Sequence, residues 1–356
     1  MATITYFISP HGLGHAARAC ACMNALWLIK PNIHFKLITG TPRWFYEESL
    51  DKQDYEIVEF QCDVGMVQAN PIHEDIPASI KKLNEFINNW EEACLELESY
   101  CKGSTFIVSD ITPIGLDIAQ RLSIPSVLIE NFTWDWIYKG YLEKEPEFKP
   151  IIEFLGAKFK LASYHIKTLP YCSKEENADL ISNPVSRKTR QERQDIEKSL
   201  GLKKDEPYVL ITLGGFSAQL EVPKCLKEVP FICVMPTDTI KVERIGSLIL
   251  VPWNGSAYHP DLVYFAQGLV GKVGYSTIAE AWQGKTPFVH IPRPDFIESQ
   301  KLCEYIEKEM RGFTITEEDY FQGKWIETWN KKSYDYLTQT EQNGADQIAE
   351  FLIKLL

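Results

Sequence analysis

The sequence predicts an α/β protein made of two similar halves, each a mostly parallel sheet with helices on both faces. Short apolar, β-rich runs alternate with helical stretches, which is the pattern of a parallel sheet. This alternation stops at a polar, charged stretch and then starts again. The 356 residues are enough for two domains with sizeable cores. Because such folds bind ligands at the carboxyl ends of their strands, we expect the site in a cleft between the halves.

In the first half the apolar runs predict strands, and the stretches between them predict helices. The expected strands are 3–9, 35–39, 56–60, 105–109 and 126–130, and the expected helices are 14–30, 78–101, 115–122 and one from Thr133. The helix 78–101 carries acidic side chains on an expected solvent face.

The stretch 171–206 interrupts the alternation, and Asn183-Pro184 marks a turn within it. We expect a linker followed by the first helix of the second half. Its basic side chains are predicted to form a solvated helix face; they are Arg187, Lys188, Arg190 and Arg193. Further strands are expected at 208–213, 231–235, 247–251, 269–273 and 288–291. We place the domains at 1–180 and 181–340, with a C-terminal helix, 341–356, packing back on the first.

Composition narrows the classes of function. The net charge is −12, which disfavours nucleic-acid binding, since phosphate neutralisation needs a basic surface. The nine cysteines are scattered and form no C-x-x-C pair, so we expect reduced thiols in a cytoplasmic protein. No basic segment precedes the first strand, and no apolar run reaches the roughly 18 residues of a membrane span. Membrane association is therefore not indicated.

The segment 272–300 is the most informative part of the chain. Gly274 is expected to free the backbone for a tight turn, and Ser276 and Thr277 stand where a helix would begin. A helix N-terminus attracts phosphate through its unpaired N–H groups and its dipole. Glu280, one turn further, could accept hydrogen bonds from ribose hydroxyls. The same Thr277-x-x-Glu280 spacing is also a capping box, which only satisfies the helix itself.

A second glycine-rich turn follows the first strand, with Gly12 and Gly14 at the opening of a helix. It resembles the dinucleotide fingerprint, in which Ala17 could replace the third glycine. However, 39–41 reads Thr-Gly-Thr where that fingerprint needs an acidic residue. This departure weakens the case for a nicotinamide cofactor.

His15 on this turn is a candidate general base, because the pKa of an imidazole lies near the working pH. Such a histidine needs a group that orients it, and Asp110, at the end of an apolar strand, is the natural candidate. The alternative is that His15 only caps or packs the turn. Arg18 could face either phosphate or an internal carboxylate.

These motifs together resemble the GT-B glycosyltransferases. The G-x-G-H turn, a Gly-Gly turn at 214–215 and the G-Y-S-T-x-x-E-A run from Gly274 are most similar to the group of the peptidoglycan N-acetylglucosaminyltransferase and the plant UDP-glycosyltransferases. The segments 109–138, 181–190 and 274–293 resemble the glycosyltransferase-like N-terminal region of L-arabinokinases. In those proteins a kinase module follows this region, and the present sequence extends only to Leu356. We therefore expect no sugar kinase activity from it.

The resemblance implies two Rossmann-like domains facing across a cleft, a nucleotide-sugar donor with UDP as the expected nucleotide, and an acceptor that is a small molecule or a glycan. It implies that His15 is the catalytic base, for which Asp110 is the orienting partner expected from the sequence itself. The implied donor-binding residues are Gly14, Gly214, Gly215, Phe216, Val251, Trp253, Gly274, Ser276, Thr277, Glu280, Asp295, Glu298 and Gln300. The implied acceptor-side residues are Asn131, Trp134 and Asp135, with core packing as the alternative for Trp134 and Trp136. We also expect His11 on the acceptor side, with a structural role as its alternative.

The chemistry that this layout favours is an inverting transfer. No D-x-D motif occurs in the sequence, which agrees with an enzyme that needs neither metal nor cofactor. Two other functions stay open: a non-catalytic protein that binds nucleotide sugars, and a UDP-sugar 2-epimerase. The loop 63–77 is expected on the acceptor side, but it carries no readable code for the acceptor.

Overall fold

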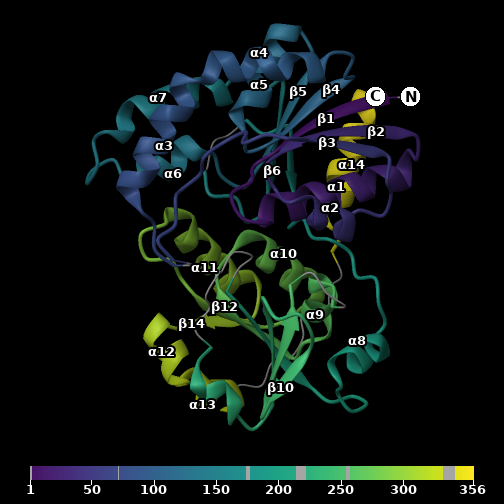
Figure 1. Cartoon of the computed structure of the whole chain (residues 1–356), viewed down its shortest axis with the longest axis vertical. Helices are drawn as coiled ribbons and strands as arrows, with labels where there is room; N and C mark the ends of the chain where they lie inside the picture. Colours follow the sequence, from purple (N-terminus) through teal and green to yellow (C-terminus); the bar gives the residue numbers. More distant parts are fainter. Residues whose placement is uncertain (1, 71, 174–176, 214–221, 254–256, 332–340) are drawn as a thin grey trace. The chain divides into compact units, whose positions relative to one another are not determined.

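The computed structural model describes residues 2–70, 72–173, 177–213, 222–253, 257–331 and 341–356. The chain divides into two compact units. The first holds residues 1–185, 295–298 and 342–356, and the second holds 186–294 and 299–341. Each unit is built on its own seven-stranded sheet with helices packed on it (Figure 1). The predicted α/β class with two sheet-and-helix halves is confirmed.

The sheet of the first unit has the strand order β3-β2-β1-β4-β5-β6-β7, and all of its strand pairs are parallel. Its strands are β1 Ala2–Ile8, β2 Ile33–Thr39, β3 Tyr55–Glu59, β4 Phe106–Asp110, β5 Ser126–Glu130, β6 Tyr164–Thr168 and β7 Leu180–Ser182. Its helices are α1 Gly14–Ile29, α2 Arg43–Ser49, α3 Ile76–Asn88, α4 Trp90–Cys101, α5 Pro113–Leu122, α6 Trp134–Lys139, α7 Phe148–Phe159 and α14 Gly344–Leu352. A last 3₁₀ turn, η2, spans Ile353–Leu355.

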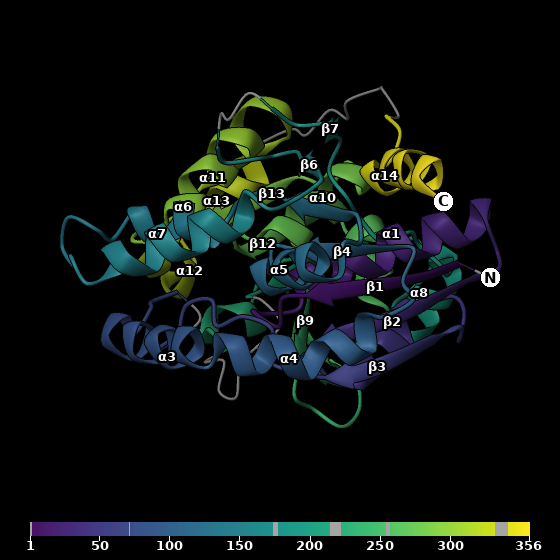
Figure 2. The ribbon, with the colours of Figure 1, turned by 90° about the horizontal axis from the view of Figure 1, so that it is seen from above.

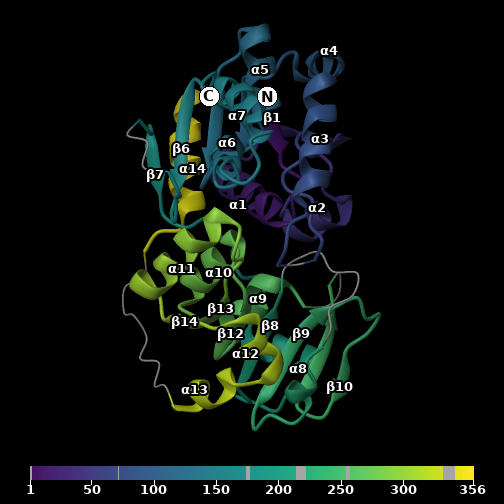
Figure 3. The same cartoon turned by 90° about the vertical axis from the view of Figure 1, so that its left-hand side faces the viewer.

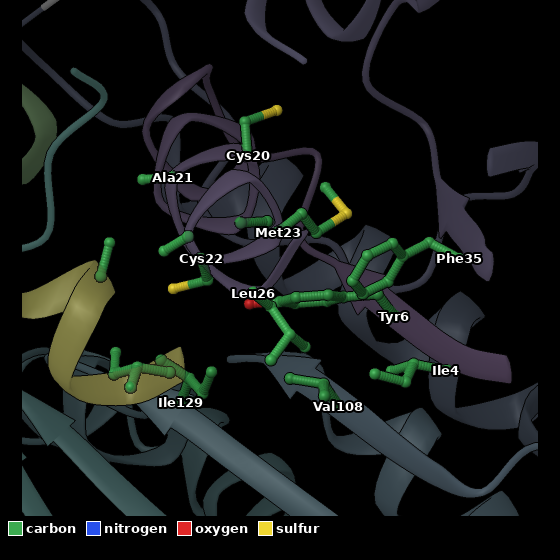
Figure 4. Packing of buried hydrophobic residues seen from close by; sticks show 14 of the residues in the cluster. Ile4, Tyr6, Cys20, Ala21, Cys22, Met23, Leu26, Phe35, Val108 and Ile129 are labelled. Carbon is green, nitrogen blue, oxygen red and sulfur yellow. The ribbon is translucent and has the colours of Figure 1, made fainter. Parts of the chain in front are cut away.

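Alternation along the strands creates two cores, one on each face of this sheet. On β1, Ile4 and Tyr6 enter the core that α1, α2 and α14 cover, whereas Phe7 enters the core beneath α4, α5 and α7. Figure 4 shows Cys22 and Leu26 of α1 packed toward Tyr6. Because Arg18 is the only charged side chain in α1 apart from a histidine, the helix can be buried on most of its surface.

The C-terminal helix α14 belongs to the first unit. It packs against α1 and β7, as the yellow helix of Figure 3 shows. The side chain of Asn343 caps its start by accepting a hydrogen bond from the N–H of Ala345 at 2.9 Å. Ile348 and Ala349 are fully buried, so the helix closes the face on which α1 lies.

The sheet of the second unit has the order β10-β11-β9-β8-β12-β13-β14, with every pair parallel except β10 and β11. Its strands are β8 Tyr208–Thr212, β9 Ile232–Thr237, β10 Glu243–Ile245, β11 Leu248–Pro252, β12 Gly268–Lys272, β13 Phe288–Ile291 and β14 Gly312–Thr314. Its helices are α8 Arg193–Leu200, η1 Lys224–Lys227, α9 His259–Phe265, α10 Tyr275–Gly284, α12 Glu317–Gln322 and α13 Trp325–Lys331. Helix α11 Ile297–Glu309 also belongs to this unit from residue 299 onward, whereas its first two residues belong to the first unit.

One core of the second unit forms where α8, α9, α10 and α11 cover the sheet. Ile278 of α10 and Leu262 of α9 meet Leu210 and Val251 of the sheet there. Figure 2 gives the view from above the chain, in which α10 and α11 can be followed. Within the described ranges, no helix combines the length and the apolar character needed to span a bilayer.

Several elements differ from the prediction. The expected helix 78–101 is two helices that meet at Asn89, whose backbone (φ −95°, ψ 8°) leaves the helical region. The helix in the linker begins only at Arg193, so the predicted helical face of basic residues is wrong. Arg187 is buried instead of solvated, because it pairs with a carboxylate of α10.

Candidate functional site

In the first unit, the side chains of His15, Asp110 and Arg18 form one buried hydrogen-bonded group. His15 stands in the first turn of α1, and Asp110 ends β4, which lies beside β1 in the sheet. His15 Nδ1 is 2.9 Å from Asp110 Oδ1. Arg18 donates from Nε to Asp110 Oδ2 at 2.8 Å and from Nη2 to Oδ1 at 2.6 Å. Of the two partners considered for Arg18, the structure therefore selects the internal carboxylate.

The geometry fixes which nitrogen of His15 carries the proton. An ionised carboxylate can only accept, so the 2.9 Å contact with Asp110 requires a proton on Nδ1. Arg18 Nη2 lies 3.3 Å from the same nitrogen, but a protonated Nδ1 cannot accept from it. In the neutral ring the lone pair then resides on Nε2, which has no hydrogen-bond partner among the residues that the structure describes. This arrangement suits a general base.

The charges in this group keep the two residues in the required states. Burial lowers the pKa of His15, against the opposing effect of Asp110, so the imidazole is neutral at pH 7. Burial acts to raise the pKa of Asp110, but the charge and hydrogen bonds of Arg18 outweigh it and lower that pKa below its usual value. Asp110 therefore remains an anion that orients the ring.

The glycine turn before α1 leads the chain into this site. Gly12 has φ +72°, the left-handed region that favours glycine. Gly14 is the first residue of α1, directly before His15. No side chain caps this end of the helix, which leaves its first N–H groups for water or a ligand.

A second carboxylate, Asp63, lies in the same unit; loop 63–77 is expected on the acceptor side, but no role is predicted for Asp63 itself. Ser9 Oγ donates to its Oδ1 at 2.9 Å, and Trp134 Nε1 donates to its Oδ2 at 2.9 Å. The backbone N–H of His11 donates to Ser9 Oγ at 3.3 Å, and the His11 ring meets Trp134 edge to face at 5.0 Å. Burial raises the pKa of Asp63 to about 7, in spite of these hydrogen bonds. The group links loop 63–77 to the glycine turn.

The expected acceptor-side residues differ in their surroundings. Trp134 is buried in the core, so packing and its bond to Asp63 account for it, and any contact with an acceptor would be indirect. Asn131 accepts from Arg18 Nη1 at 2.8 Å and donates to Glu298 Oε1 at 2.7 Å. Asp135 lies apart from this group and pairs with Lys139 on α6 at 3.1 Å.

In the second unit, the start of α10 carries two of the expected phosphate contacts. Gly274 is the N-cap with φ −159°, an extended conformation open to any residue, so the predicted need for glycine in a tight turn is wrong. The capping-box alternative is also wrong, since no side chain caps this helix. Ser276 and Thr277 are half-buried in its first turn, and their hydroxyls have no partner among the described residues.

Glu280 is buried and holds two basic side chains of its own unit. Its Oε1 accepts from Arg187 Nε at 3.2 Å and Nη2 at 3.0 Å. Its Oε2 is 2.7 Å from His259 Nδ1. Arg187 and Arg190 lie over the ring of Tyr258, at 5.0 and 4.5 Å from its centre. Burial acts to raise the pKa of Glu280, but the charge of Arg187 and the hydrogen bonds from Arg187 and His259 lower it overall.

The other residues expected to contact the donor differ in their burial. Val251 is fully buried in the core, so only its backbone could reach a base, whereas Trp253 follows β11 and is half-buried. Asp295 and Gln300 are exposed, and Glu298 is buried against Asn131 within the first unit. The predicted residues Gly214, Gly215 and Phe216 lie outside the described residues. Over the described ranges, no group of acidic, histidine or cysteine side chains could hold a metal ion.

Solved structures with the same fold cover nearly the whole chain. A UDP-glucosyltransferase from Polygonum tinctorium that glucosylates indoxyl matches 99% of this chain and 98% of its own, with a TM-score of 0.62 and 13% identity. UGT89C1 of Arabidopsis thaliana, solved with UDP, matches 99% of both chains, with a TM-score of 0.64 and 10% identity. MurG of Acinetobacter baumannii matches 99% of this chain and 100% of its own, with a TM-score of 0.56 and 14% identity.

The chain has the GT-B fold. These identities are low, so the likeness concerns the arrangement of the two sheets and their helices. On the GT-B frame, the His15 group belongs to the N-terminal sheet, and the Glu280 group belongs to the C-terminal sheet.

A sequence relative adds a second likeness to this GT-B chain. The L-arabinokinase of Arabidopsis thaliana is 26% identical over 325 residues, which are 90% of this chain and 31% of the relative. The chain thus spans about a third of the length of the curated relative that it matches. No protein-family model matches the chain.

Proposed function

We propose that this chain is an inverting, metal-independent glycosyltransferase that moves a sugar from a UDP donor to an acceptor hydroxyl. The observation that carries the proposal is the His15–Asp110–Arg18 group on a GT-B fold, which provides a neutral imidazole whose Nε2 bonds to none of the described residues. The likeness to solved UDP-glycosyltransferases supports the choice of reaction.

The first unit supplies the base. Nε2 of His15 takes the proton of the acceptor hydroxyl as the oxygen attacks the anomeric carbon. The imidazolium that forms is stabilised by the Asp110 carboxylate at Nδ1. Arg18 keeps Asp110 ionised throughout, so the proton stays on His15 until the product leaves.

The second unit holds the leaving group. As the new carbon–oxygen bond forms, the bond from the anomeric carbon to the diphosphate oxygen breaks, and its electron pair passes to UDP. Unpaired N–H groups at the start of α10 and the hydroxyls of Ser276 and Thr277 are suited to this growing charge. Attack opposite the leaving group inverts the anomeric centre. The Glu280 group is assigned to the ribose.

The proposal is tested by identifying a donor and then following its turnover. A panel of UDP, GDP and ADP sugars is screened by thermal shift, because a ligand that binds only the native state raises the melting temperature. The donor that stabilises most is incubated with the protein and mixed hydroxyl acceptors, and NMR follows both nucleotide release and the anomer formed. We expect UDP-sugars to stabilise most and the anomeric configuration to invert.

Three results would contradict parts of this proposal. Binding without any turnover would indicate a non-catalytic sugar-nucleotide protein, which the match to one part of a larger arabinokinase makes a real alternative. Retention of configuration would exclude the single displacement. Conversion of the UDP-sugar to its 2-epimer, with UDP still attached to the product, would identify the chain as an epimerase.

A further inference from the structure

The Glu280 group contains a histidine that neither the sequence motifs nor the proposed mechanism uses. His259 begins α9, which packs against α10. Its Nδ1 lies 2.7 Å from Glu280 Oε2, while its side chain remains 24% exposed. The Glu280 side chain is only 3% exposed. Of the two, the imidazole is therefore the one that a ligand can reach.

The hydrogen bonds of Glu280 leave it little capacity for a ligand. A carboxylate offers about four lone-pair sites. Arg187 occupies Oε1 with both Nε and Nη2, and His259 occupies one site on Oε2. A ribose diol needs two acceptors, so Glu280 cannot bind both hydroxyls while these contacts stand.

The carboxylate also determines which nitrogen of His259 faces a ligand as an acceptor. Since Glu280 accepts from Nδ1, the neutral ring carries its lone pair on Nε2. No described residue is hydrogen-bonded to that nitrogen. A bare ring nitrogen is complementary to a hydroxyl donor and not to a phosphate, which has only acceptors. The phosphate contacts, Ser276 and Thr277, lie one helical turn before Glu280 on α10.

We propose that His259 is the ribose-binding residue of this chain, with Nε2 accepting a hydrogen bond from the 2′-hydroxyl of the nucleotide and Glu280 acting as the residue that positions the ring. Arg187 neutralises the buried carboxylate and fixes its orientation from the other side. The inference rests on the proposed UDP-dependent function and assigns one contact within it.

The test separates the ring nitrogen from the carboxylate behind it. In the variant His259→Asn, the amide nitrogen stands near the position of Nδ1 and keeps the bond to Glu280, but the acceptor at Nε2 is lost. Calorimetry gives the Kd of UDP and of 2′-deoxy-UDP for the wild type and the variant. We expect the wild type to prefer UDP by about tenfold, the worth of one hydrogen bond. H259N should bind the two ligands almost equally.

A matched control exists in the other unit. His34 pairs with Asp54 through Nδ1 at 2.8 Å, and its side chain is 29% exposed, so His34→Asn removes another partly exposed imidazole that is hydrogen-bonded to a carboxylate. H34N should keep the wild-type preference for UDP. The melting temperature of each variant shows whether the fold is intact.

Each outcome decides the inference. If H259N keeps the tenfold preference, Glu280 contacts the ribose directly, and the inference is overturned while the proposed function stands. The same holds if the wild type binds both ligands equally. If the wild type binds no UDP at all, both the inference and the UDP-dependent function are overturned.

Discussion

The buried pair of Arg18 and Asp110 allows a quantitative prediction. Both side chains are almost wholly buried, at 1% and 0% exposure. In Arg18→Met the carboxylate of Asp110 loses the only cation that compensates it among the described residues, apart from a protonated His15. Breaking a buried pair in this way costs about 3–5 kcal/mol of unfolding free energy. For a unit of this size that corresponds to a fall of roughly 6–20 °C in melting temperature.

The same substitution should change the pH dependence of activity. The positive charge of Arg18 is one of the causes that lower the pKa of His15, although burial is the larger one. Removing that charge raises the pKa of His15, so the rise of activity with pH moves to higher pH. A pH–rate profile of R18M, measured with saturating donor at a temperature where the variant remains folded, shows whether the rise of activity moves to higher pH.

A double-mutant cycle isolates the pair. Denaturant unfolding is measured for R18M, for Asp110→Asn and for the double variant, in which neither side chain is left as an unpaired charge. We expect the double variant to be less destabilised than the sum of the single ones by about 1–3 kcal/mol. Additivity within about 0.5 kcal/mol would refute the claim that the two charges depend on each other. Glu91→Ala, which breaks the exposed pair with Arg121, serves as a control and should leave the melting temperature close to that of the wild type.

Two further predictions follow from the two units. Because the pKa of Asp63 is about 7 when folded and about 3.9 when unfolded, its contribution to stability is complete below pH 4 and is lost as the pH rises to 7. Asp63→Asn should therefore gain stability relative to the wild type over this range, by on the order of 4 kcal/mol of unfolding free energy. If denaturant unfolding gave the same difference between the two proteins at pH 4 and at pH 8, this prediction would be contradicted. The double variant Ser276→Ala, Thr277→Val should bind UDP about ten- to a hundredfold more weakly by calorimetry, since it lacks two hydroxyl donors to phosphate. Uridine binding is the control and should not change; an equal loss for uridine would show that the helix start itself was damaged.

The sequence was sufficient for the central strands of both sheets. Buried strands in parallel sheets are continuous apolar runs, and the bounds predicted for β5 and β13 are those observed. It did not predict β6, because His165 and Lys167 interrupt its apolar pattern. In the fold both are accommodated: His165 bonds to Glu130, and Lys167 to Ser173. These partners are separate from the strand itself, so no local pattern could have shown them.

The same distinction between local patterns and partners distant in the sequence explains which contacts of the site could be predicted. The proximity of His15 and Asp110 could be predicted, because each follows or ends a strand at the same edge of one sheet. The partners of Glu280 could not. Arg187 lies 93 residues from it and His259 lies 21 residues from it, and each is one of several polar residues in its segment. The sequence favoured a solvated Arg187, since nothing local distinguishes a buried arginine from an exposed one.

The central claim is that His15 is the base in a sugar transfer, and His15→Ala tests it most directly. Turnover of the best UDP-sugar is compared for the wild type, H15A and His34→Ala, together with the Kd of UDP. We expect H15A to lose about 10²–10⁴-fold in turnover with the Kd of UDP unchanged, because His15 and the α10 phosphate contacts belong to different units, and H34A to behave as the wild type. Turnover by H15A within a few fold of the wild type would contradict the account.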